Sequence, residues 1–175
     1  MVELVPITRD NWRAAVGVRV AEGQLPYVAA YEPVALIILA KAFLRVADLD
    51  WWPMLITEDG KPRGVVALVD ERGPRSGLAI FHLVIDRDQQ RRGYGRAALQ
   101  AIVSLAERTQ GCERLSLTVH PENSVAIALY RSQGFVDDGV AEDGDLRMLA
   151  DISVFGSGGQ LPVPPGAAPG PDARR

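Results

Sequence analysis

The stretch that decides the fold is Phe81-His82-Leu83-Val84-Ile85-Asp86-Arg87-Asp88-Gln89-Gln90-Arg91-Arg92-Gly93-Tyr94-Gly95-Arg96. It predicts a strand up to Ile85, a polar turn, and a helix that begins at Gly95. The first backbone N–H groups of a helix have no intrahelical partner and lie at the positive end of the helix dipole. Because Gly93 and Gly95 carry no side chain, a phosphate group can approach this backbone closely. The stretch therefore predicts an anion-binding loop.

Three basic side chains, Arg91, Arg92 and Arg96, surround the same point in a chain whose formal net charge is −3. They favour an anion as the ligand. A lone G-x-G motif is also compatible with a plain glycine turn that leads into a helix, so the motif needs support from elsewhere in the chain.

A second motif follows, on the next predicted strand and helix. It reads Thr118-Val119-His120-Pro121-Glu122-Asn123-Ser124-Val125-Ala126-Ile127-Ala128-Leu129-Tyr130-Arg131-Ser132-Gln133-Gly134-Phe135. The segment Gln90 to Gly95 resembles the Q/R-x-x-G-x-G/A signature of the GNAT N-acetyltransferases. The second motif resembles that family's strand followed by N-x-x-A-x-x-L-Y-x-x-x-G-F. The resemblance covers most of the chain, up to about Ile152.

The resemblance implies acetyl-CoA as co-substrate, no metal, and a direct attack by a primary amine. It implies cofactor-binding roles for Leu83, Val84, Ile85, Gln90, Arg91, Arg92, Gly93, Tyr94, Gly95, Arg96 and Asn123. In the family, the strand pairs with the pantetheine arm, the loop holds the pyrophosphate, and the residue at Asn123 contacts the cofactor arm. Tyr130 matches the residue that protonates the leaving thiolate, a role that suits a phenol.

The acceptor amine must lose a proton before it attacks, since alkylammonium groups have a pKa near 10. Candidate bases are Glu22, Glu32, Asp48 and Asp50, and for each the alternative is a solvated surface carboxylate. Thr118 stands where some protein-acetylating relatives carry a glutamate. Residues 18–29 and 135–146 resemble bacterial spermine/spermidine acetyltransferases. A polyamine is therefore the expected acceptor, ahead of an aminoglycoside, an amino acid or a protein N-terminus.

The order of predicted elements indicates a mixed α/β domain. Apolar patterns predict strands at residues 2–7, 52–58, 64–70, 78–85, 115–119, 135–140 and 146–152. Helices are expected from Thr8 to about Val20, over 34–46 with an apolar face at Leu36, Leu39, Ala40 and Phe43, over 95–108, and from an Asn123 cap to Gly134. Short turns at 59–62 and 73–77 predict an antiparallel meander. With the resemblance, this gives a mainly antiparallel central sheet flanked by helices.

Composition and charge exclude several classes of protein. The length of 175 residues suits one domain, expected at 1–153, and the Gly/Pro-rich composition of 154–175 predicts a disordered tail. The mild net negative charge argues against a nucleic-acid partner. The single cysteine, Cys112, excludes an internal disulfide, and His82 and His120 lack a metal-ligand pattern. Without a signal peptide or a long apolar run, the expected location is cytoplasmic with no membrane partner; a homodimer is compatible with an exposed edge strand.

Two other functions fit parts of the sequence. Residues 93–98 also fit the G-x-G-x-x-G/A pattern of dinucleotide-binding enzymes, and Glu113 lies near the spacing expected for the ribose-binding acid. The loop before Gly93 is too long for the tight turn of that fold, and the preceding strands predict a meander. The second alternative is an acyl-CoA-binding module without turnover, against which the presence of both Asn123 and Tyr130 argues.

Overall fold

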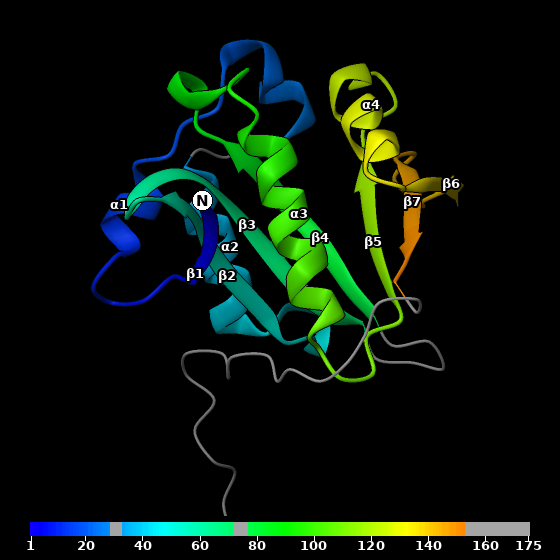
Figure 1. The fold of residues 1–175 in the computed structure, drawn as a ribbon, viewed down its shortest axis with the longest axis horizontal. Helices are drawn as coiled ribbons and strands as arrows, with labels where there is room; N and C mark the ends of the chain where they lie inside the picture. The colour runs from blue at the N-terminus through cyan, green and yellow to red at the C-terminus, as the bar shows by residue number, and fades with distance from the viewer. Residues whose placement is uncertain (29–32, 72–76, 153–175) are drawn as a thin grey trace, which may run out of the picture.

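A seven-stranded sheet forms the centre of the computed structural model, which describes residues 1–28, 33–71 and 77–152 (Figure 1). Its strands lie in the order β1-β2-β3-β4-β5-β7-β6. Their bounds are β1 Val2–Pro6, β2 Trp51–Glu58, β3 Lys61–Glu71, β4 Gly77–Ile85, β5 Arg114–Val119, β6 Val136–Val140 and β7 Leu146–Asp151. Neighbouring strands are antiparallel except for the β4–β5 pair. The predicted mixed, mainly antiparallel sheet is confirmed.

Helices cover both faces of the sheet. The α-helices are α1 Trp12–Val16, α2 Val34–Leu44, α3 Tyr94–Glu107 and α4 Ser124–Ser132; short 3-10 helices are η1 Glu22–Tyr27, η2 Val46–Asp48 and η3 Arg87–Gln89. One core joins α3 and α4 to the sheet, and a second core joins α1 and α2 to it. Figure 1 shows α3 in front of the sheet and α2 behind it. Strand β3 is buried on both sides because Val66 and Leu68 face the first core while Val65, Ala67 and Val69 face the second.

The parallel strands β4 and β5 separate along their length. They pair only from Gly77 opposite Arg114 to Ile80 opposite Leu117, although β4 continues to Ile85. The divergence of the two strands is visible in Figure 1. Beyond Ile80 the β5-facing edge of β4 is therefore left without a β5 partner, a place where another extended chain could pair with it.

A β-bulge interrupts β4 at the point where it leaves β5. Val65 lies opposite Val84 whereas Ala67 lies opposite Phe81, so β4 contains one more residue than β3 there. His82 has a left-handed φ of 52°. Bulges bend the strand that contains them and are frequent beside active sites. The sequence predicted a regular strand here and missed the bulge.

Two predicted helices differ from the structure. The helix expected from Thr8 to Val20 is only Trp12–Val16, and it begins after Asn11, whose side chain makes no capping hydrogen bond to the helix. Asn11 Oδ1 accepts the Thr8 backbone N–H at 2.7 Å, and this bond forms a turn where the helix was expected to begin.

The predicted apolar face of α2 was wrong at Leu36, Ala40 and Phe43, although Leu39 does pack against the core. Leu36 is 47% exposed and Phe43 88% exposed, whereas Val34, Ala35 and Ile38 are buried against the sheet. The sequence of α2 is apolar on every side except at Lys41, so its periodicity could not identify the buried face.

Some predictions lie outside the described residues: most of the turn at 73–77, Glu32, and the tail 154–175. The domain boundary at residue 153 remains a prediction for the same reason. Within the described ranges, the structure contains no helix that is both long and apolar enough to cross a membrane.

Candidate active site

The start of α3 is an open helix N-terminus. Its N-cap, Gly93, has a φ of 84°, offers no side-chain cap, and no acidic residue lies in the first turn. The preceding loop begins at Asp86, whose carboxylate accepts the backbone N–H of Asp88 at 3.0 Å. Among the described residues, no side chain therefore caps the first N–H groups of α3, which an anion can use.

The two glycines of this loop have different roles. Gly93 adopts a left-handed conformation, and a Cβ added there would meet nothing within 4 Å. A Cβ added to Gly95 would lie 3.1 Å from Leu129 Cδ2 and 3.9 Å from Ile85 Cγ1. Gly93 is thus required by backbone conformation and leaves open space, whereas Gly95 permits close packing of α3 against α4 and β4.

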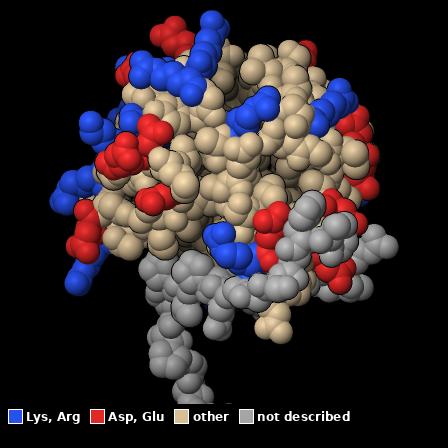
Figure 2. Space-filling view, viewed as in Figure 1, with Lys and Arg blue, Asp and Glu red and all other residues tan. Residues whose placement is uncertain are grey.

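Arg91, Arg92 and Arg96 are exposed around this N-terminus. Across the described part of the chain, none of the three forms an ion pair within 4.0 Å. Figure 2 shows Lys and Arg gathered along the upper edge of the molecule, where α3 begins in Figure 1. Cations without carboxylate partners beside an open helix N-terminus form a favourable site for phosphate groups.

Gln90 closes the base of the loop. Its Nε2 atom donates to the backbone oxygen of Ile85 at 3.0 Å and to Oε1 of Gln24, in η1, at 2.7 Å. The backbone N–H of Arg19 also donates to Asp86 Oδ2 at 3.0 Å. The side chain of Gln90 is therefore committed to the protein, and the loop is tied to the segment between α1 and α2.

The side chain of Tyr94 points toward the β2–β3 hairpin. Its hydroxyl donates to Glu58 Oε2 at 2.5 Å, and the Arg63 guanidinium lies 5.0 Å from its ring centroid. The hydrogen bond from Tyr94 is the main cause that lowers the pKa of Glu58, and the same bond raises the pKa of Tyr94. Only the backbone of Tyr94 is directed to the candidate anion site. The sequence signatures gave no sign of Glu58 or Arg63.

Two predicted site residues lie on or beside α4. Asn123 is the N-cap, as predicted, and its Oδ1 accepts the backbone N–H of Ala126 at 3.2 Å. Tyr130 is 9% exposed and its ring lies 5.8 Å from that of Phe135. Burial raises the pKa of Tyr130 to about 12, so its phenol stays protonated at neutral pH. Its neighbour Leu129 lies against Gly95, which brings α4 to the start of α3.

The predicted strand residues are Leu83, which lies in the bulge, and Val84 and Ile85, which follow it. Leu83 and Ile85 pack toward the core shared with α3, and Val84 is buried toward α2. This part of β4 leads directly into the loop and no longer pairs with β5. The structure thus brings the predicted strand, loop and α4 residues to one end of the sheet.

The bulge residue His82 faces α2. Its Nε2 lies 2.9 Å from Lys41 Nζ, which also lies 4.8 Å from the centroid of the Trp51 ring. Burial, followed by the nearby charge of Lys41, lowers the pKa of His82 to about 4, so the imidazole is neutral at pH 7. Within the described ranges, no group of three His, Cys, Asp or Glu side chains could hold a metal ion.

Residues from three segments meet at the end of β5. The ring of Tyr27, in η1, lies 5.2 Å from that of His120. Burial, and then the charge of Asp143, raises the pKa of Asp145 in the β6–β7 turn, while His120 lowers it. The ring of Tyr27 thus lies beside the imidazole of His120, and His120 and Asp143 are near enough to influence the charge of Asp145. Tyr27 and Asp145 lie in the two stretches, 18–29 and 135–146, whose resemblance favoured a polyamine, although neither was predicted as a site residue.

The candidate bases are not brought together. Glu22 begins η1. Asp50 pairs with Arg45 at 2.8 Å and, with Asp48, precedes β2, at the opposite end of that strand from Glu58. Asp48 and Asp50 are thus distant from the start of α3, and their solvated or ion-paired surface roles are the better account.

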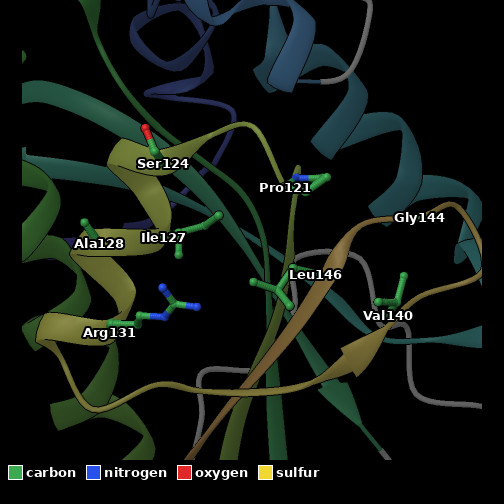
Figure 3. Close-up of a pocket in the computed structure, with 8 residues that line it drawn as sticks. All are labelled: Pro121, Ser124, Ile127, Ala128, Arg131, Val140, Gly144 and Leu146. Carbon is green, nitrogen blue, oxygen red and sulfur yellow. The ribbon is translucent and has the colours of Figure 1, made fainter.

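A cavity of about 440 Å³ lies between α4 and the β6–β7 hairpin (Figure 3). Its lining residues are Pro121, Ser124, Ile127, Ala128, Arg131, Val140, Gly144 and Leu146. Arg131 is already paired with Asp137 at 2.7 Å. None of the site residues predicted from the sequence lines this cavity.

Comparison with known proteins agrees with the predicted signatures. The model of the Acetyltransferase (GNAT) family matches residues 19–135. The ribosomal protein bS18-alanine N-acetyltransferase of Escherichia coli is 43% identical over 56 residues, which span 32% of this chain and only 37% of that relative. A probable spermine N(1)-acetyltransferase of Bacillus subtilis is 24% identical over 165 residues, 86% of this chain and 99% of the relative. A Vibrio cholerae spermidine N-acetyltransferase, solved with CoA and spermine, has a TM-score of 0.70 at 19% identity, and covers 88% of this chain and 97% of its own.

Proposed function

This chain belongs to the GNAT acetyltransferase family, and on that premise we propose that it transfers the acetyl group of acetyl-CoA to a primary amine. The donor and the acceptor would bind together, and the amine would attack the thioester directly. The observation that carries the proposal is the start of α3, where Gly93 provides no side-chain cap and three arginines lie without ion-pair partners among the described residues. Such a site suits the pyrophosphate of coenzyme A.

The cofactor would extend from this loop toward the bulge in β4. The pyrophosphate would bind the backbone N–H groups of residues 93–96. The loop arginines would add positive charge, and Gln90 would hold the base of the loop in place. The pantetheine arm would pair with the backbone of residues 83–85, at the edge of β4 that β5 leaves free. The Asn123 side chain would contact the arm from the start of α4. No metal takes part in this account.

The chemistry needs three proton and charge events. A neutral amine attacks the thioester carbonyl, forming a C–N bond and a tetrahedral oxyanion, which a backbone N–H of Val84 or a neighbour would stabilise. The C–S bond then breaks, and the thiolate of coenzyme A takes a proton from the Tyr130 hydroxyl. The proton that the attacking nitrogen loses as it becomes an amide returns to the Tyr130 phenolate, directly or through water. A phenol with a pKa of about 12 is protonated at neutral pH, so its proton is present when the thiolate leaves. Placing both substrates in one site would supply much of the rate.

For the acceptor we propose a polyamine. The likeness to the Bacillus spermine acetyltransferase and the fold shared with the Vibrio spermidine enzyme support this class. The cluster of Tyr27, Asp143 and Asp145 at the end of β5 supports it further, because an aromatic face and carboxylates both attract ammonium groups. An aminoglycoside, an amino acid or a protein N-terminus remain the alternatives to test.

The assembly and location of the protein are also proposals. Strand β6 lies at the edge of the sheet, with Val136 64% exposed and Val140 71% exposed, which supports a homodimer formed through this edge. A cytoplasmic location agrees with a small-amine substrate and with a donor made inside cells.

An acceptor panel tests the proposal. Release of coenzyme A from acetyl-CoA is measured with spermine, spermidine, short diamines, an aminoglycoside, amino acids and a peptide N-terminus, each alone. Turnover with polyamines only is the expected result. Turnover with another member overturns the polyamine assignment and keeps the reaction. If no amine is acetylated while acetyl-CoA still raises Tm, an acyl-CoA-binding module becomes the better account.

A further inference from the structure

Three side chains whose residue types the sequence signatures leave unspecified fix the proposed pyrophosphate loop to the β2–β3 hairpin. The Tyr94 hydroxyl donates to Glu58 Oε2 at 2.5 Å, and Arg63 Nη2 donates to the same oxygen at 3.3 Å. The Arg63 guanidinium lies 5.0 Å from the centroid of the Tyr94 ring. These residues are called the Glu58–Arg63–Tyr94 anchor below.

The anchor reaches both ends of the loop. Arg63 Nη1 donates to Gln89 Oε1 at 3.0 Å, and the Arg63 backbone oxygen accepts the N–H of Asp86 at 2.8 Å. Gln89 comes directly before Gln90, and Tyr94 comes directly after Gly93. One arginine side chain therefore contacts the residue on each side of the segment 90–93, which sets the distance between the two ends of the loop.

The guanidinium of Arg63 binds other side chains of the protein. Its side chain is 15% exposed, and two of its nitrogens are already used by Gln89 and Glu58. The Glu58 carboxylate offsets the charge of Arg63, while the loop arginines keep theirs. The same network thus stiffens the loop and leaves positive charge at the start of α3 available to a ligand.

We infer that Glu58, Arg63 and Tyr94 are positioning residues that hold the first N–H groups of α3 in the geometry needed for the pyrophosphate. This inference rests on the proposed use of acetyl-CoA. It predicts a loss of affinity only for donors that carry the pyrophosphate. For Glu58, charge and positioning predict opposite effects. Removing the carboxylate takes a negative charge away from the phosphate site, which by charge alone would tighten binding of acetyl-CoA, whereas loss of positioning would weaken it.

The test compares two donors, acetyl-CoA and S-acetylpantetheine, which lacks the pyrophosphate and the nucleotide. Tyr94→Phe removes the hydroxyl and keeps the ring beneath Arg63; Glu58→Ala removes the shared acceptor. For both variants kcat/KM with acetyl-CoA is expected to fall about 3–10-fold, through KM and with kcat retained, as for loss of one hydrogen bond. With S-acetylpantetheine kcat/KM is expected to equal that of the wild type.

Glu71 supplies a matched control at the other end of β3. Its carboxylate accepts the Ser116 hydroxyl at 2.8 Å and lies 3.9 Å from Arg114, so it too is shared by a hydroxyl and an arginine. Glu71→Ala is expected to leave the ratio of the two kcat/KM values unchanged. Equal losses with both donors in the anchor variants, or tighter acetyl-CoA binding in Glu58→Ala, would overturn the inference.

Calorimetry with coenzyme A separates this inference from the proposed function. If the wild type binds coenzyme A but acetylates no amine, the proposed function fails and the anchor is still tested, because Tyr94→Phe must raise the Kd for coenzyme A and not for pantetheine. If Tyr94→Phe binds coenzyme A as the wild type does, the anchor is wrong even where turnover is normal.

Discussion

Gly95 and Leu129 lie against each other where α3 begins beside α4: a Cβ built on Gly95 would lie 3.1 Å from Leu129 Cδ2. This contact joins the proposed pyrophosphate loop to the helix that carries Tyr130. It also explains why a side chain at the second glycine of the loop would press against Leu129, whereas the glycine two residues earlier has open space around it.

Gly95→Ala is expected to weaken coenzyme A binding by moving α3 away from α4. Because Leu129 presents a flexible methyl group, the added Leu129→Ala change is expected to restore most of the lost affinity. Gly93→Ala acts differently, through a φ of 84°, and is expected to lower stability by about 1–2 kcal/mol with no rescue by Leu129→Ala. Calorimetry and thermal melts of the four variants check this; rescue of both glycine variants by Leu129→Ala would contradict it.

Tyr130→Phe is expected to lower kcat by about 10²-fold, the lower end of the usual effect of a general acid. The ring stays packed on Phe135, so the Kd for coenzyme A should change less than about 2-fold, as for a conservative change that keeps its packing. Single-turnover kinetics together with calorimetry measure both values. An unchanged kcat at saturating substrates would remove Tyr130 from the chemistry.

The loop arginines are expected to act through charge. Replacing Arg91, Arg92 and Arg96 by Gln should raise the KM for acetyl-CoA and reduce its dependence on salt, because exposed cations at this site are screened by added ions. The measurement is KM between low and high ionic strength. A salt dependence equal to that of the wild type would place the phosphates elsewhere.

His82 gives stability a defined pH dependence. Its pKa is about 4 in the folded protein and near 6.5 when unfolded. The unfolded chain therefore binds the proton first, and stability is lost as the pH falls from about 6.5 toward 4, by roughly 2–3 kcal/mol at most. His82→Gln should flatten this part of the Tm profile. An equally steep profile in His82→Gln would show that other groups cause the loss.

The orientation of α2 can be tested through its apolar residues. Ile38 is fully buried, so Ile38→Ala is expected to cost about 2–5 kcal/mol. Phe43 is 88% exposed, so Phe43→Ser is expected to change the stability of the monomer by less than about 0.5 kcal/mol. Denaturant unfolding at low protein concentration gives both values; the reverse order would indicate the face predicted from the sequence.

Local signals explain what the sequence could predict. The strand, loop and helix from Phe81 onward follow from apolar spacing and two glycines, and the cap by Asn123 follows from one residue beside its helix. Both depend on neighbours a few positions away. The order of strands and helices was predictable for the same reason.

The features that the sequence did not predict depend on contacts between residues that are far apart in the chain. Arg63 and Tyr94 are 31 positions apart by their numbers, so nothing near the loop indicated the anchor. The bulge at His82 appears only in the pairing of β4 with β3. The face of α2 could not be chosen because its apolar residues surround the helix, and only packing on the sheet decides which are buried.

The most direct test of the central claim is acetyl transfer itself. Purified protein is mixed with acetyl-CoA and a pool of primary amines, and free thiol and acetylated amine are measured together by a thiol reagent and mass spectrometry. Thiol and acetylated amine are expected in equal amounts, and both are expected to fall sharply in Tyr130→Phe. No thiol release, combined with no rise in Tm when acetyl-CoA is added, would contradict it.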